Sequence, residues 1–198
     1  MTVRILGMDP GISNLGFGVL EVDPYVKKPF KLIYSDSAQG EHNEFGVRAD
    51  NPHQVRAKGL TRVYSYVFDK FEPHVVGCED NFLGINPASF KRLIEVVSYF
   101  NIYTVTNKRD TAFKLVLPRL AKQIIGVDFR GTTKDDVREG LKKCPFLDLN
   151  GIDLDKLTEH AHDGILIALY VAVQYYKSLG WSVENEQTER GNEGNNKT

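Results

Sequence analysis

The sequence has very little cysteine, with only Cys78 and Cys144 in 198 residues. Cys78 lies inside an apolar run, and Cys144 directly precedes a proline. Two thiols are too few for a disulfide framework or a zinc cluster. We therefore interpret both cysteines as buried free thiols of a protein that works in a reducing compartment.

Long hydrophobic runs are also missing. No apolar stretch approaches the roughly 20 residues that a membrane span needs, and no basic segment leads into a signal-type stretch. We expect a soluble, non-exported, cytoplasmic protein. A hydrophobic share of 41% suits one domain with a substantial core, which we place at residues 1–181. Residues 182–198 have too little apolar surface to order and are predicted to be a disordered tail.

The chain lacks a strong excess of either charge, because its formal net charge is −1. The charges are unevenly distributed, however. Residues 90–143 carry 12 Lys/Arg against 6 Asp/Glu, and residues 182–198 carry 2 against 4. A basic middle segment is an ordinary solvated surface when taken alone. Beside a catalytic site it indicates contacts with phosphates.

Apolar periodicity and turn residues predict an α/β fold with a five-stranded mixed sheet flanked by helices. Three strands form an antiparallel meander, and two parallel strands follow, each after a helix. The expected strands are residues 3–8, 15–22, 31–35, 74–78 and 102–106. The expected helices are residues 55–71, a segment opening at Asn86-Pro87, residues 112–125, a helix capped by Thr132 or Thr133 that runs to about Lys143, and residues 157–179.

Three acidic residues stand where predicted elements begin or end. Asp9 follows the first strand, Glu79 ends the fourth, and Asp163 lies near the start of the last helix. Carboxylates suit Mg²⁺ or Mn²⁺, and two such ions about 4 Å apart support phosphodiester hydrolysis. His160 shares a helix face with Asp163 and could ligate a metal or transfer a proton, whereas His162 points elsewhere. Taken one at a time, these acids could equally serve a turn, a strand end or a helix start.

Several motifs occur in an order that resembles the RuvC-type Holliday-junction resolvases, which belong to the RNase H-like nucleases. The similarity runs from about Val3 to Val173. The motifs are Ile5-Leu6-Gly7-Met8-Asp9-Pro10-Gly11, Gly16-Phe17-Gly18-Val19, Cys78-Glu79-Asp80-Asn81-Phe82, Asn86-Pro87-Ala88-Ser89, Lys122-Gln123-Ile124-Ile125-Gly126 with Lys134, and His160-Ala161-His162-Asp163-Gly164-Ile165-Leu166-Ile167-Ala168.

This resemblance implies an RNase H-like fold and a homodimer that hydrolyses paired phosphodiesters in four-way DNA junctions, in a bacterial or phage-infected cell. It implies two Mg²⁺ or Mn²⁺ ions and no small organic cofactor. Many family members carry aspartate at the position of His160, so metal preference can differ here. The implied metal ligands and catalytic residues are Asp9, Glu79, His160 and Asp163, and the implied nucleic-acid contacts are Phe82, Lys122 and Lys134.

Three other functions compete with junction resolution. A nuclease of the same fold could act on flaps, forks or RNA–DNA hybrids, because carboxylates alone do not define a substrate. An actin-like ATPase also has a glycine-rich hairpin, like Asp9-Pro10-Gly11 with Gly16 and Gly18, but that fold normally needs two such domains. A non-catalytic scaffold that binds DNA junctions would not need all three carboxylates.

Overall fold

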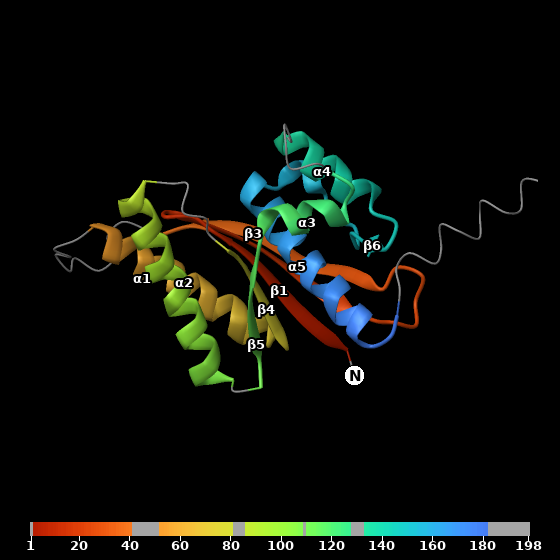
Figure 1. Ribbon diagram of the computed structural model, residues 1–198, viewed down its shortest axis with the longest axis horizontal. Helices are drawn as coiled ribbons and strands as arrows, with labels where there is room; N and C mark the ends of the chain where they lie inside the picture. Colours follow the sequence, from red (N-terminus) through yellow and green to blue (C-terminus); the bar gives the residue numbers. More distant parts are fainter. Residues whose placement is uncertain (1, 41–51, 81–85, 109, 128–132, 182–198) are drawn as a thin grey trace, which may run out of the picture.

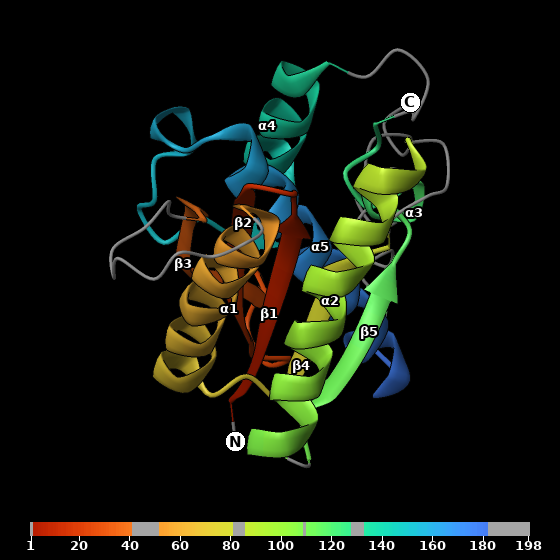
Figure 2. The same ribbon diagram turned by 90° about the vertical axis from the view of Figure 1, so that its left-hand side faces the viewer.

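A mixed β-sheet forms the centre of the computed structural model, with helices on both of its faces (Figure 1). The structure describes residues 2–40, 52–80, 86–108, 110–127 and 133–181. The predicted tail at residues 182–198 therefore lies outside the described residues. Helices α1 and α2 cover one face, and α3, α4 and α5 lie over the other (Figure 2).

The sheet has the strand order β5-β4-β1-β2-β3-β6. The first three strands form the predicted antiparallel meander, while β4 and β5 run parallel to β1. The sixth strand was not predicted, because two residues show no periodicity. The strands are β1 Val3–Pro10, β2 Asn14–Val22, β3 Phe30–Gln39, β4 Val75–Glu79, β5 Ala112–Val116 and β6 Leu147–Asp148.

The predicted fifth strand at residues 102–106 is wrong. These residues complete helix α2 (Pro87–Asn107), and β5 occupies part of the segment that we expected to be helical. The β-branched side chains of residues 102–106 favour a strand locally. Packing reverses that preference, because Phe100 and Thr104 lie one helical turn apart and are both fully buried. The hydroxyl groups of Thr104 and Tyr64 are 2.5 Å apart, which links α2 to α1.

The remaining helices agree with the sequence pattern more closely. Thr133, one of the two predicted caps, begins α4 with a capping box, and Thr158 caps α5. The predicted helix at residues 112–125 is reduced to α3. The bounds are α1 Pro52–Phe71, α3 Pro118–Ile124, α4 Lys134–Lys143, the 3-10 helix η1 Leu154–Lys156, and α5 Glu159–Ser178.

Helix α5 is the central element of one of two hydrophobic cores. Twelve of its residues are buried, most of them between the sheet and α3 or α4. The second core lies between the sheet and helices α1 and α2. Both cysteines are buried free thiols, as predicted. No described helix is long and apolar enough to cross a membrane.

Candidate active site

Two of the predicted acidic residues leave the same edge of the sheet. Asp9 is the second-last residue of β1, and Glu79 is the last residue of β4. Strands β1 and β4 are parallel neighbours, with Met8 paired to Cys78. Because parallel strands end at one edge, the two carboxylates lie side by side. The turn at Pro10-Gly11 ends β1 just beyond Asp9.

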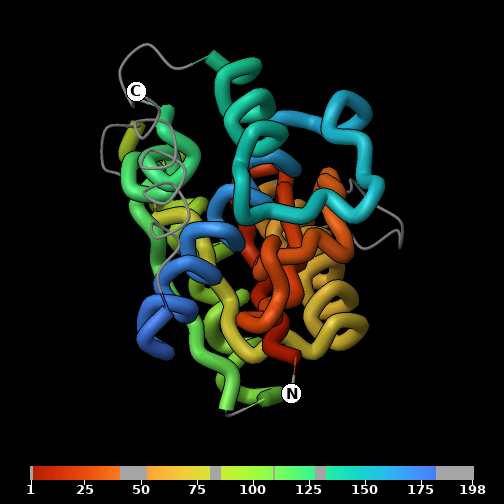
Figure 3. Tube along the Cα trace, turned by 90° about the vertical axis from the view of Figure 1, so that its right-hand side faces the viewer, coloured from red at the N-terminus to blue at the C-terminus, as the bar shows by residue number. Residues whose placement is uncertain are grey.

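Helix α5 brings Asp163 and His160 to this edge because it lies almost directly on the backbone of β1 and β2. A Cβ atom at Gly16 would be 1.8 Å from the carbonyl oxygen of His160. A Cβ atom at Gly164 would be 2.5 Å from the Cα of Phe17. Glycine is therefore needed on the facing surfaces of β2 and α5, and this close approach packs α5 against β1 and β2 (Figure 3).

The three carboxylates repel one another in a poorly solvated site. Burial, followed by the charges of Asp9 and Asp163, raises the pKa of Glu79 to about 8. Burial and the charge of Asp9 raise the pKa of Asp163 to about 6, and this rise is opposed by Lys122 and His160. The site thus concentrates negative charge that a cation would neutralise.

His160 contacts both strands of the β1–β2 hairpin. Its Nδ1 atom is 2.7 Å from Oδ2 of Asp9, and its Nε2 atom is 3.4 Å from Nδ2 of Asn14. The hydrogen bond to Asp9 is the main cause of a raised His160 pKa. Asn14 was not found from the sequence, because it contacts a residue 146 positions away only through the crossing of α5. His162 is buried and hydrogen bonded to the carbonyl of Leu154.

The donor set fits a divalent metal in its chemistry. Carboxylate oxygens and one imidazole are suitable ligands for Mg²⁺ or Mn²⁺, and a cation would relieve the repulsion that raises the pKa of Glu79 and Asp163. Within the described part of the chain, no three His, Cys, Asp or Glu side chains are already arranged around a metal position. The ligand set of Asp9, Glu79, His160 and Asp163 therefore stays a prediction.

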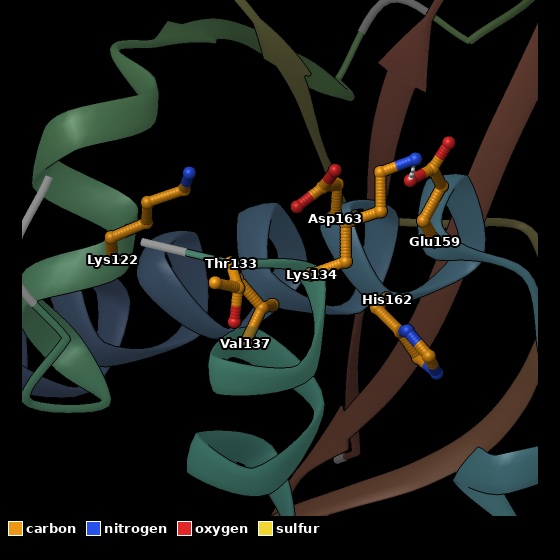
Figure 4. Close-up of a pocket in the computed structure, with 7 residues that line it drawn as sticks. All are labelled: Lys122, Thr133, Lys134, Val137, Glu159, His162 and Asp163. Carbon is orange, nitrogen blue, oxygen red and sulfur yellow. Dashed lines mark ion pairs between the residues drawn. The ribbon is translucent and has the colours of Figure 1, made fainter. Parts of the chain in front are cut away.

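A small pocket adjoins the carboxylates on the side of α3 and α4. Lys122 of α3 points its ammonium group toward Asp163, and Lys134 of α4 forms an ion pair with Glu159 (Figure 4). The two predicted phosphate-contacting lysines thus line one pocket. Glu159 was not singled out from the sequence, where it resembles an ordinary acidic residue of a helix start. The predicted DNA contact Phe82 lies outside the described residues.

Comparisons with known proteins find similarity to Holliday-junction resolvases. The chain is 35% identical over 94 residues to crossover junction endodeoxyribonuclease RuvC of Methylobacillus flagellatus, covering 45% of this chain and 47% of the relative. It is 36% identical over 87 residues to RuvC of Ralstonia pickettii, covering 44% and 42%. The aligned segments thus span about half the length of these relatives. No protein-family model matches the chain.

Solved structures agree over nearly the full chain. The superposition on RuvC of Thermus thermophilus covers 90% of this chain and 97% of the RuvC chain, with 19% identity and a TM-score of 0.65. The chain therefore has a RuvC-like fold. The same protein in complex with a Holliday junction substrate gives 18% identity over the same shares and a TM-score of 0.64. The yeast mitochondrial Holliday junction resolvase Ydc2 covers 89% and 82%, with 16% identity and a TM-score of 0.62.

The raised pKa values of Glu79 and Asp163 predict that the metal-free protein loses stability as pH rises from about 5 to about 8. Glu79 and Asp163 bind protons more tightly in the folded than in the unfolded state. The free energy of unfolding therefore decreases as pH rises, up to about pH 8. Protonated His160 acts in the same direction, because its stabilisation is lost as pH rises through its raised pKa. Thermal melts in chelator would measure this slope, and Glu79→Gln should make it shallower.

Mg²⁺ or Mn²⁺ should reverse this loss of stability at high pH. Because metal competes with protons for the same carboxylates, the increase in Tm on adding metal should be larger at pH 8 than at pH 5. An equal increase at both pH values would contradict a metal site at these carboxylates.

Proposed function

We propose that this protein is a divalent-metal-dependent endonuclease that resolves four-way DNA junctions. The observation that carries the proposal is the convergence of Asp9, Glu79 and Asp163 at one sheet edge of a RuvC-like fold. The names of its relatives support the same reaction, since they are crossover junction endodeoxyribonucleases. A structural neighbour is bound to a Holliday junction substrate.

In this proposal Asp9, Glu79, Asp163 and His160 hold two Mg²⁺ or Mn²⁺ ions at the sheet edge. The ions would supply Lewis acidity toward the phosphodiester and its attacking water. Asp9 orients His160 through their hydrogen bond, and His160 can exchange a proton there near neutral pH. Burial of Glu79 and Asp163 keeps their carboxylates poorly solvated, so that ion binding is favoured over hydration.

The two lysines of the adjoining pocket serve the DNA backbone. Lys122 and Lys134 come from different helices and face a common space beside Asp163 (Figure 4). A phosphate next to the one being cut would be neutralised there, with release of its counterions. Phe82 is proposed to contact the junction, as the family resemblance implies. Such contacts position the DNA without reading its sequence.

We also propose that the protein is a homodimer that pairs through α2. One face of α2 is buried against the sheet, but Ile94, Tyr99, Ile102 and Val105 remain exposed, Ile102 at 57%. An exposed apolar stripe on a helix is typical of a protein interface. A two-fold dimer would present two sites to the equivalent strands of a four-way junction.

Replacing Ile102 with Glu should disrupt this dimer. Burying a carboxylate in an apolar interface is unfavourable, so the variant should be monomeric at concentrations at which the wild type is dimeric. Light scattering after size exclusion would show the mass roughly halved. The matched control is Val26→Glu, which adds the same charge at an exposed apolar residue of the β2–β3 connection. A dimeric Ile102→Glu variant would contradict pairing through α2.

The function itself is tested by incubating labelled four-way junction, linear duplex, flap and RNA–DNA hybrid with the protein and Mg²⁺ or Mn²⁺, or with chelator. Paired, metal-dependent nicks at the junction are the expected result. Preferred cutting of the flap or the hybrid would keep the metal site but assign a different substrate. Absence of cleavage with either metal would overturn the proposal.

A further inference from the structure

The pocket beside the carboxylates contains an acidic residue among its lysines. Glu159 forms an ion pair with Lys134, the first residue of α4, and both line the same pocket as Lys122 and Asp163 (Figure 4). The Lys134 side chain is 77% exposed, and that of Glu159 is 38% exposed. The carboxylate of Glu159 is thus paired with the lysine that the proposed function assigns to a DNA phosphate.

The position of Glu159 is well defined by its surroundings. It is the first residue of α5, directly after the capping residue Thr158. The Thr158 side chain accepts a hydrogen bond from the backbone N–H of Ala161 and donates one of 2.8 Å to the hydroxyl of Ser37 on β3. This anchor ties the first turn of α5, which also contains His160, to the sheet. Glu159 is therefore held beside the predicted metal ligands and not on a loose segment.

The electrostatics of the two helix starts favour this ion pair. Glu159 stands at the N-terminus of α5, where a negative charge is stabilised by the helix dipole. Lys134 stands at the N-terminus of α4, where a positive charge is unfavourable. Both helix starts therefore favour the pairing of Lys134 with Glu159 when no nucleic acid is bound.

We propose that Glu159 is an affinity-determining residue that occupies Lys134 in the free protein and must be displaced by a DNA backbone phosphate. This inference rests on the proposed function. On binding, Lys134 exchanges a carboxylate for a phosphate, and the released Glu159 takes up a cation from solution. Lys134 therefore adds little to the net release of counterions, which lowers both the affinity for DNA and its dependence on salt.

Glu159→Gln should free Lys134 and tighten junction binding. Because the ion pair is exposed, we expect a gain of roughly two- to fivefold at low salt. The slope of log affinity against log salt should become steeper by up to about 0.9, because cation uptake at Glu159 no longer offsets the counterion that the Lys134–phosphate contact releases. Fluorescence anisotropy of a labelled four-way junction, titrated in chelator between about 50 and 200 mM salt, would measure both quantities without cleavage.

Glu21→Gln is the matched control. Glu21 is also a partly exposed carboxylate in an ion pair, with Arg4 at 3.1 Å, but it pairs at the opposite end of β1 from Asp9. The control should leave affinity and salt slope close to those of the wild type. Circular dichroism and Tm would verify that both variants are folded.

Two further outcomes separate the inference from the proposed function. If the wild type does not bind the junction, the proposed function fails. If the wild type binds but Glu159→Gln behaves like Glu21→Gln, only the inference is overturned. Glu159→Gln should also gain less in a Lys134→Met background, and an equal gain there would show that Glu159 does not act through Lys134.

Discussion

Replacement of Asp9 by asparagine should abolish DNA cleavage while junction binding survives. Asp9 interacts with every other group of the site. Its charge raises the pKa of Glu79 and of Asp163, and its carboxylate is hydrogen bonded to His160. An amide oxygen is a much weaker ligand for Mg²⁺ or Mn²⁺ than a carboxylate. Loss of the several kcal/mol that metal catalysis supplies predicts a drop in the cleavage rate of roughly 10³-fold or more.

Binding should survive this substitution for an electrostatic reason. The Asp9→Asn change removes one negative charge from a site that must accept a polyanion, so affinity for the junction in chelator should stay equal or increase. The repulsion on Glu79 and Asp163 should also decrease, which would keep the Tm at pH 8 from falling.

The matched control for this experiment is Asp23→Asn, in the connection between β2 and β3. Asp23 accepts a hydrogen bond from the backbone of Tyr25, and asparagine can do the same, so cleavage should be unaffected. Gel assays of cleavage and anisotropy of binding give the two readouts. Wild-type cleavage by Asp9→Asn would refute Asp9 as a metal ligand, and loss of binding would indicate a structural role instead.

The second large effect should come from Gly16→Ala, a single added methyl group. That methyl would be 1.8 Å from the carbonyl oxygen of His160, which belongs to helix backbone and cannot rotate away. Helix α5 must therefore shift, at a cost of about 3 kcal/mol, the upper part of the range for overpacking. For a protein of this size the Tm should fall by roughly 10 °C.

Cleavage should be lost in Gly16→Ala even at temperatures where the protein is folded. A displaced α5 separates His160 from Asp9, which removes the main cause of the raised His160 pKa. An NMR titration of His160 should therefore show a lower pKa in the variant.

Gly140→Ala is the control for this substitution. Its added Cβ would be 2.8 Å from the Cδ1 atom of Ile125, the end of a flexible side chain, and alanine favours the helix there. An unchanged Tm and His160 pKa in Gly16→Ala would contradict the close approach of α5 to the hairpin.

Local sequence determined the elements that carry the carboxylates. The apolar run before Asp9 and the turn at Pro10-Gly11 predict a strand that ends at the site, and the run before Glu79 does the same. Thr132 and Thr133 likewise predict the start of α4, because a helix cap is made by residues within four positions of one another, and the structure places the cap at Thr133. Such features need no distant partner, which is why they could be read in advance.

Tertiary packing decided the features that the sequence left open or misassigned. Residues 102–106 have strand-like side chains but are helical, because Phe100 and Thr104 bury one face of α2. Strand β5 is a mostly exposed edge strand, and its identity depends on pairing with β4.

The contacts within the site belong to the same group. Asn14 meets His160, and Lys134 meets Glu159, only after α5 crosses the hairpin and α4 packs beside it. These contacts join residues up to 146 positions apart, and periodicity within a segment contains no information about such distances. The sequence by itself thus determined which residues stand at the ends of elements, and the packing of α5 against the glycines of β1 and β2 decided which of them meet.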